Sequence, residues 1–317
     1  MNFIVNLSVV FAATMIACMA VLIARRWQAE RRQDGISAQS SAITRAYLQR
    51  LGGDLNVEPP VAGPVALSAV LHLSQLFRGA ERARLLALAE ADGLFDLALS
   101  KLRHSGPPGR VRAIQMLGQF GGERSIEALL GRMADDPLPA LRLEAASALA
   151  TLGRLPAPAD TIAMLGLAHN TPTRAHSALL RSLALSHATE LGDLLGDPLP
   201  VALRCMIVDA LGWSRDYAVA DLIGQAGRDA NPEMRCAALR AARQLGRPDA
   251  AKWILPLLAD RVAEVRVNAI RACDTLHIEQ AVEALELLCS DQQWWVRSRA
   301  EEALATLRPP QPTSVAA

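Results

Sequence analysis

Apolar residues recur along most of the chain at intervals of three, four and seven positions, the spacing of one face of an α-helix. Stretches with this pattern that follow a short turn are 125–134, 160–168, 218–226, 250–259 and 278–288. Each is preceded by a segment in which small or apolar residues follow an arginine at the third, sixth and seventh positions. The pattern predicts units of two amphipathic helices. Less regular helices are predicted at 68–77, 82–90 and 94–102.

One arginine recurs at nearly constant spacing and gives the length of the unit. The arginines are Arg110, Arg142, Arg174, Arg204, Arg235, Arg266 and Arg297, and their spacings are 32, 32, 30, 31, 31 and 31 residues. A repeat of this period is typical of a helical solenoid, in which each unit buries its apolar face against its neighbours.

Aspartates recur with the arginines. Asp136, Asp229, Asp260 and Asp291 stand six residues before their arginines. An aspartate there can cap the following helix or pair with an arginine of the adjacent repeat. We therefore predict a structural ladder of aspartates and arginines; the alternative is a row of anion-binding arginines.

The unit resembles the HEAT repeat of the short, phycobilisome-lyase type, whose pattern is Asp-Pro…Val-Arg-x-x-Ala-x-x-Ala-Leu-Gly. The match is carried by segments such as Leu141-Arg142-Leu-Glu-Ala-Ala-Ser-Ala-Leu-Ala and extends over about residues 80–308. At the unit of Arg174 the sequence departs from the pattern, because Arg181 replaces an apolar residue and Asn170 replaces the aspartate. The resemblance implies an all-α fold: a right-handed α-solenoid, or superhelix, of about seven helix pairs.

The N-terminal segment is apolar and uncharged. Phe3–Ala24 contains 22 residues, long enough as a helix to cross a hydrocarbon core of about 30 Å. A basic, aromatic flank follows, formed by Arg25, Arg26, Trp27, Arg31 and Arg32. The positive-inside rule places such a flank in the cytoplasm. We expect a single-pass inner-membrane protein with its N-terminus outside and its solenoid cytoplasmic.

These observations divide the chain into four parts. They are a transmembrane helix (1–24), a basic juxtamembrane segment with a Gly/Pro linker (25–64), the solenoid (65–308) and a disordered tail (309–317).

Charge is nearly balanced, with 33 Lys and Arg against 32 Asp and Glu. Residues 25–50 carry a net +4, so residues 51–317 carry −3. A nucleic-acid binder needs a basic groove, which this balance disfavours. The five cysteines form no CxxC pair and the six histidines form no HExxH motif. We therefore predict no catalytic, cofactor or metal site and a protein that is not an enzyme.

The second helix of each unit is expected to line the concave surface of the solenoid, the surface that such proteins use for binding. Charged and aromatic residues predicted to contact a partner there are Tyr217, Asp221, Lys252, Trp253, Glu279, Glu283 and Glu286. This arrangement favours a non-catalytic scaffold that binds a partner protein at the membrane.

Resemblance also suggests what the partner is. Membrane-anchored HEAT proteins of similar appearance accompany bacterial envelope or polysaccharide-synthesis machinery, which implies a membrane glycosyltransferase as partner. The repeat type carries a second implication, a phycobilin-lyase-like or other small-molecule-binding enzyme. That alternative requires Lys252, Asp221 and Glu283 to converge on one pocket.

Overall fold

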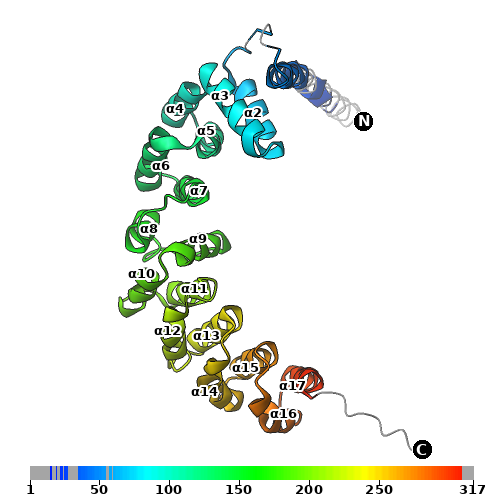
Figure 1. The fold of residues 1–317 in the computed structure, drawn as a ribbon, viewed down its shortest axis with the longest axis vertical. Helices are drawn as coiled ribbons and strands as arrows, with labels where there is room; N and C mark the ends of the chain where they lie inside the picture. Colours follow the sequence, from blue (N-terminus) through cyan, green and yellow to red (C-terminus); the bar gives the residue numbers. More distant parts are fainter. Residues whose placement is uncertain are drawn as a thin grey trace, which may run out of the picture. The chain divides into compact units, whose positions relative to one another are not determined.

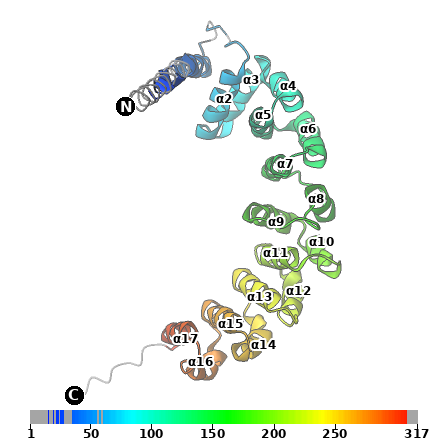
Figure 2. The same ribbon diagram turned by 180° about the vertical axis from the view of Figure 1, so that it is seen from behind.

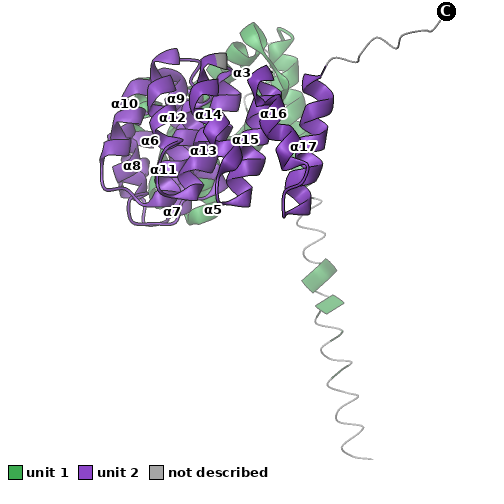
Figure 3. Ribbon diagram, turned by 90° about the horizontal axis from the view of Figure 1, so that it is seen from below, with its two compact units in different colours: residues 1–128 green, residues 129–317 purple. Residues whose placement is uncertain are grey.

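The computed structural model describes Met15, Met19, Leu22, Ile23 and residues 25–27, 35–54, 57, 58 and 60–308. These residues contain helices and no strand, which confirms the predicted all-α class. The chain divides into two compact units, residues 1–128 and 129–317, with the boundary inside α6 (Gly122–Asp135) (Figure 3). The predicted solenoid of residues 65–308 extends over both units.

Two predicted segments fall mainly outside the described residues. Of the expected membrane span, 3–24, only Met15, Met19, Leu22 and Ile23 are described. No helix in the described part of the chain combines the length and the apolar character needed to cross a bilayer. The expected tail, 309–317, is not described at all.

Unit 1 consists of antiparallel helices that agree with the three irregular ones expected from the sequence. They are α2 (Pro64–Leu76), α3 (Gly79–Ala91), α4 (Leu94–His104) and α5 (Pro107–Phe120), followed by the start of α6. Prolines at the first turns of α2 and α5 suit positions where the backbone N–H has no helical partner. Phe95 and Phe120 pack edge to face, with ring centroids 5.4 Å apart, and join α4 to α5.

Unit 1 also contains a helix over residues 35–51. Tyr47 is fully buried, and its hydroxyl donates to Oδ2 of Asp92 at 2.8 Å. Arg50 donates to both oxygens of the same carboxylate, at 2.6 and 3.1 Å. Burial, together with the hydrogen bond to Asp92, raises the pKa of Tyr47. This helix lies in the basic segment expected to precede the Gly/Pro linker.

Unit 2 is built of two rows of helices that follow an arc (Figures 1 and 2). The inner row consists of α7 (Pro139–Thr151), α9 (Arg174–Ser186), α11 (Val201–Leu211), α13 (Pro232–Leu245), α15 (Ala263–Thr275) and α17 (Trp294–Leu307). The outer row consists of α8 (Pro158–Leu165), α10 (Ala188–Asp193), α12 (Ala220–Ala226), α14 (Ala251–Ile254) and α16 (Val282–Leu288).

Short 3-10 turns extend the outer helices. They are η1 (Leu194–Gly196), η2 (Tyr217–Val219), η3 (Pro248–Ala250), η4 (Leu255–Ala259) and η5 (Glu279–Ala281). Pro256 lacks an N–H group and cannot continue an α-helix. The helix expected at 250–259 is accordingly divided near this proline into α14 and η4, and η3 precedes α14.

The inner row contains the arginine helices, so the expectation that the second helices line the concave side is wrong for unit 2. Small residues explain why. A Cβ atom on Gly212, at the end of α11, would lie 2.6 Å from Cα of Ala241 on α13. Arginine helices can therefore approach each other closely, and closely spaced helices occupy the inside of a curve. The short second helices lie outside.

Candidate functional site

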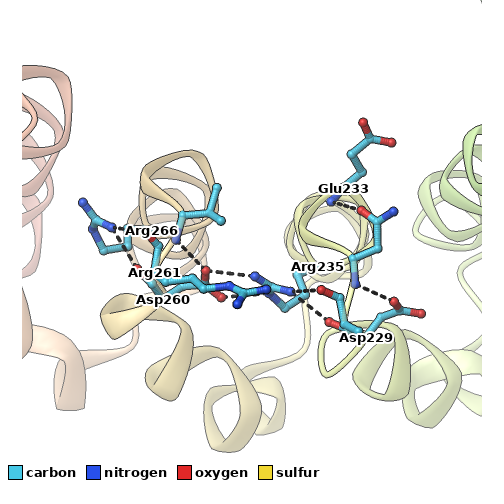
Figure 4. Close-up of polar contacts among 9 residues, drawn as sticks. Asp229, Glu233, Arg235, Asp260, Arg261 and Arg266 are labelled. Atoms are coloured by element: carbon cyan, nitrogen blue, oxygen red, sulfur yellow. Dashed lines mark hydrogen bonds and ion pairs between the residues drawn. The ribbon is translucent and has the colours of Figure 1, made fainter.

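Arginines and aspartates of the C-terminal part of unit 2 form ion pairs between adjacent repeats (Figure 4). Arg235 on α13 donates through Nε and Nη2 to the two carboxylate oxygens of Asp260, at 2.8 and 2.9 Å. Its Nη1 donates to the carbonyls of Asp229 and Ala230, both at 2.9 Å. The side chains of Arg235 and Asp260 are 9% and 8% exposed. A bidentate pair so deeply buried fixes one repeat against the next.

The next repeat has the same geometry. Arg266 donates through Nε and Nη2 to Asp291, both at 2.8 Å, and through Nη1 to the carbonyl of Asp260 at 2.8 Å. In each pair the aspartate follows its arginine by 25 residues. We call such a pair a rung and the series of rungs the ladder.

Asp260 and Asp291 also close the turn that leads into the helix that follows each of them. Oδ1 of Asp260 accepts from the N–H of Val262 at 2.8 Å, and Oδ1 of Asp291 accepts from that of Gln293 at 2.9 Å. Burial alone would raise the pKa of both carboxyls. Hydrogen bonds from the arginine and from the backbone outweigh it and lower the pKa of Asp260 and of Asp291. Asp136 makes the same turn, accepting from Leu138 at 3.0 Å.

Rungs are absent in the middle of the chain. Twenty-five residues after Arg142 stands Leu167, which is 1% exposed, and Arg142 donates instead to the carbonyl of Met164 at 3.1 Å. The next rung is incomplete as well, because Arg174 is exposed and contacts no aspartate among the described residues.

The position expected for Arg174 is taken by Thr173. Buried Leu179, Leu180 and Leu183 stand six, seven and ten residues after Thr173, as buried Ala210, Leu211 and Ser214 do after Arg204. With Thr173 in register, the two neighbouring spacings become 31 residues each. Thr173 caps α9 together with His176. Arg174 is therefore not a ladder residue, and the uneven spacings of 32 and 30 were the signal.

The outer members of the ladder differ from the central pairs. Arg204 makes one bond to Asp229, at 3.3 Å, in a pair that is 29% and 23% exposed. Arg297 donates through Nη1 to the carbonyls of Asp291 and Gln292, at 2.8 and 3.3 Å. Arg110 lies half-buried on α5 in unit 1.

The inner row of unit 2 presents a continuous set of accessible side chains. We define the inner face by the partly or fully exposed residues on the side of these helices opposite the outer row: Ala202, Asp209, Trp213, Glu233, Arg240, Gln244, Glu264, Arg271, Thr275, Trp295 and Glu302. Trp213 and Trp295 are 42% and 44% exposed. Large exposed tryptophans beside arginines are the residue types that dominate protein interfaces.

Polar contacts connect neighbouring helices across the inner face. Arg240 forms a bidentate pair with Asp209, at 2.9 and 2.8 Å. Arg181 on α9 lies over the ring of Trp213, 4.8 Å from its centroid.

Arg243, at the edge of this face, donates to Oγ1 of Thr275 at 3.3 Å. Burial and the nearby cations Arg271 and Arg299 lower the pKa of Arg243, against the opposing effect of Asp274. Arg271 makes no ion pair among the described residues. The eleven residues of the inner face therefore include two arginines and four carboxylates, so charges of both signs lie on it together with Trp213 and Trp295.

The residues predicted to bind a partner lie on the outer row instead. Tyr217 is 57% exposed and lies under Arg247, whose guanidinium is 5.1 Å from the ring centroid. Asp221 and Trp253 line a cleft of about 110 Å³ between α12 and α14, together with Arg247 and Asp249.

Trp253 is not the exposed anchor that was expected. It is half-buried against α12, because a Cβ atom on Gly227 would lie 2.5 Å from its ring. The indole ring of Trp253 therefore packs mainly against Gly224 and Gly227.

The other predicted partner residues do not join this cleft. Lys252 lines a separate groove beside the Arg235 rung. Glu279 and Glu283 are exposed on η5 and α16, and Glu286 pairs with Arg308. Asp221 and Lys252 line different clefts, and Glu283 lines neither of these two. No cluster of His, Cys, Asp and Glu suited to a metal ion occurs in the part of the chain that the structure describes.

The cysteines of the repeats lie among packed helices. Cys236 and Cys273 are buried, and burial raises the pKa of the Cys236 thiol to about 11. In the predicted membrane flank, Arg25, Arg26 and Trp27 are helical and exposed, whereas Arg31 and Arg32 lie outside the described residues.

Comparison with protein families decides the assignment. The family of HEAT repeats matches residues 83–184 and 188–266, which together are more than half of the chain. The chain belongs to the HEAT-repeat family. The Arg235 rung lies within the matched residues, as does most of the repeat of α8 and α9, which has no rung.

Solved structures resemble this HEAT-repeat protein more distantly. An engineered protein is 18% identical, with a TM-score of 0.39, and the match covers 76% of this chain and 78% of that one. The complex of CpcE and CpcF of phycocyanin lyase from Nostoc sp. is 21% identical, with a TM-score of 0.34 and coverage of 68% and 94%. Human deoxyhypusine hydroxylase is 16% identical, with a TM-score of 0.34 and coverage of 86% and 98%.

Because these TM-scores are below 0.5, the structural likenesses carry no argument about function. No curated protein matches the sequence.

Proposed function

We propose that this HEAT-repeat protein is a membrane-anchored, non-catalytic scaffold that binds a partner protein through the inner face of unit 2. The observation that carries the proposal is the composition of that face. Trp295 and Arg271 are accessible on α17 and α15, which the buried rungs of Arg235 and Arg266 hold against their neighbours, and Trp213 is accessible in the turn after α11. Preorganised aromatic and arginine side chains lose little entropy on binding, which favours an interface.

The membrane part of the proposal rests on the sequence. Phe3–Ala24 is apolar and uncharged, and the arginines that follow favour a cytoplasmic solenoid. Beyond this segment, helix 35–51 is held to the other helices of unit 1, because Tyr47 and Arg50 both bind Asp92.

An inner-face variant and an outer-face variant test which surface binds. The inner variant carries Trp213→Ala and Arg271→Glu; the matched outer variant carries Tyr217→Ala and Glu283→Lys. The full chain is crosslinked in membranes and purified, and captured proteins are compared with those of the unmodified chain. Circular dichroism confirms that both variants are folded. A membrane glycosyltransferase is one protein to look for in the captured material.

We expect capture to be lost in the inner variant and kept in the outer one. Loss in the outer variant alone would return the interface to the second helices. Equal capture by all three proteins would contradict binding through either face.

The anchor is tested separately. The full chain should stay in the membrane fraction during alkaline extraction, and removing residues 1–24 should release the protein from membranes. Replacing Arg25, Arg26, Arg31 and Arg32 by Glu should disturb its topology, measured by protease access to the solenoid. Membrane association that survives the deletion would contradict the proposed anchor.

A further inference from the structure

Three ladder arginines are held in the same way by their own repeats. Nη1 of Arg235 donates to the carbonyls of Asp229 and Ala230, and Nη1 of Arg266 to those of Asp260 and Arg261. Arg297 repeats this arrangement, donating to the carbonyls of Asp291 and Gln292. The local fold therefore fixes the direction of each guanidinium before any carboxylate binds.

The three differ at the opposite edge of the guanidinium. Nε and Nη2 of Arg235 hold Asp260, and those of Arg266 hold Asp291. Nε and Nη2 of Arg297 contact no partner among the described residues. No ion pair joins Arg297 to Glu301, one turn later on α17. Arg297 thus presents the bidentate edge that receives an aspartate in the two preceding repeats.

The surface around Arg297 is the side of α17 that would face a next repeat. Trp294, three residues before Arg297, is 66% exposed and packs edge to face on Trp295. Ala305 lies on the same stripe and is exposed. Glu301 occupies the position that Leu239 and Ile270 fill with buried apolar side chains in earlier repeats. At this one position a charged side chain therefore replaces the apolar contact of the earlier repeats.

We propose that the α17 side receives a second protein, which places an aspartate on the open edge of Arg297 and an apolar contact on Trp294. Its aspartate begins a helix and accepts the backbone N–H two residues on, as Asp260 and Asp291 do. Such a turn fixes the carboxylate in the orientation that a bidentate arginine requires. This docking surface is distinct from the inner face.

An extended chain tests whether Arg297 can receive such a carboxylate. A copy of residues 278–308 is placed directly after Arg308, so that the copy of Asp291 follows Arg297 by the 25 residues found in the existing rungs. The matched control has Asn at that position of the copy. We expect the Asp version to unfold about 2–4 °C higher. Equal midpoints would show that Arg297 does not receive a carboxylate and would overturn the proposal.

Photocrosslinking tests whether a partner uses the site. A photoreactive amino acid replaces Ala305 in the full chain, in the cells that make the protein. We expect one adduct with another protein, reduced about tenfold by Arg297→Gln, since the bidentate contact would be a central one. The adduct should also be blocked by the extended chain and should persist in Glu301→Gln and in the inner-face variant. Its identified partner should lose the adduct when its own aspartate becomes Asn.

Three outcomes overturn the proposal: no adduct, an adduct with a second copy of this chain, or an adduct unaffected by Arg297→Gln. Arg297→Lys guards against a folding artefact, because it keeps the charge and loses the bidentate edge. An equal reduction in Arg297→Lys supports the bidentate contact, and full retention contradicts it. If the full chain captures no partner through the inner face but this adduct still forms, only the proposed function is contradicted.

Discussion

Two regions of unit 2 share one fold but differ in their polar contacts. From α11 to α17, Arg204, Arg235 and Arg266 each meet an aspartate of the next repeat. From α7 to α11, Arg142 meets no carboxylate, and Thr173 stands where the next arginine would be. The comparison shows that rungs are not required for the HEAT fold. They add a fixed geometry to repeats that apolar packing already holds together.

Leu167 explains how the region without rungs is stabilised. It takes the position of the ladder aspartate and is 1% exposed. Replacing a buried ion pair by apolar contacts is often neutral for stability, because two charges no longer lose their hydration. Breaking an existing pair is costly, since it leaves one charge buried alone. The two regions should therefore respond differently to the same substitution.

The largest difference is expected from Arg235→Met and Arg142→Met. The first leaves the buried carboxylate of Asp260 without its arginine and should lower the free energy of unfolding by about 3–5 kcal/mol. The second removes one bond to a carbonyl and a buried Nε without a partner, and it should cost under about 1 kcal/mol. Urea unfolding measures both. Equal losses would contradict the distinction between the two regions.

Asp260→Asn sharpens the comparison, because Asn keeps the turn to Val262 while removing the charge. We expect a loss of about 2 kcal/mol, the value of a buried charged hydrogen bond. Asp197→Asn is the matched control. Asp197 is exposed and makes no ion pair among the described residues, so its substitution should leave the urea midpoint unchanged. A large effect at Asp197 would indicate a rung that the structure lacks.

Acid should weaken the paired region selectively. The pKa values of Asp260 and Asp291 are lowered in the folded protein, so their stabilisation is present above the unfolded value of about 3.9 and is lost as pH falls through the folded values. The free energy of unfolding should decrease below about pH 4, and the decrease should be smaller in Asp260→Asn. The same pH slope in both proteins would contradict this assignment.

The smallest effect is expected from Asp209→Asn on the inner face. Its partner Arg240 is 42% exposed, and exposed pairs contribute on the order of 0.5 kcal/mol. The urea midpoint of the Asp209→Asn variant should therefore be nearly that of the unmodified protein, and this midpoint should depend little on salt. A loss comparable to that of Asp260→Asn would show that the inner face stabilises the fold as much as the ladder does.

Most of the fold could be predicted from the sequence, because helical periodicity and a constant repeat length are local properties. The constant arginine spacing gave the repeat units, including the positions of Asp260 and Asp291. The row that lies on the inside of the arc could not be predicted. It depends on how closely neighbouring helices approach, which is decided by contacts such as Gly212 against Ala241.

The candidate site was harder to predict for the same reason. Tyr217 and Trp253 were selected as aromatic residues near charges, but Trp253 packs on glycines and both lie on the outer row. Trp213, Arg240 and Arg271 were missed. Arg240 and Arg271 each follow a ladder arginine by five residues. This regular offset was visible in the sequence, but only the arrangement of the two rows shows that it places both arginines on the inner face.

Hydrogen exchange of the inner helices tests the difference between the two regions most directly. α15 lies between two complete rungs, and α9 lies between two empty ones. Local opening exposes amides more often where fewer buried contacts hold a helix. We predict that the amides of α9 exchange at least about tenfold faster than those of α15. We also predict that Asp260→Asn raises the exchange rates of α13 and α15 towards that of α9. Equal protection of α9 and α15 would contradict the account.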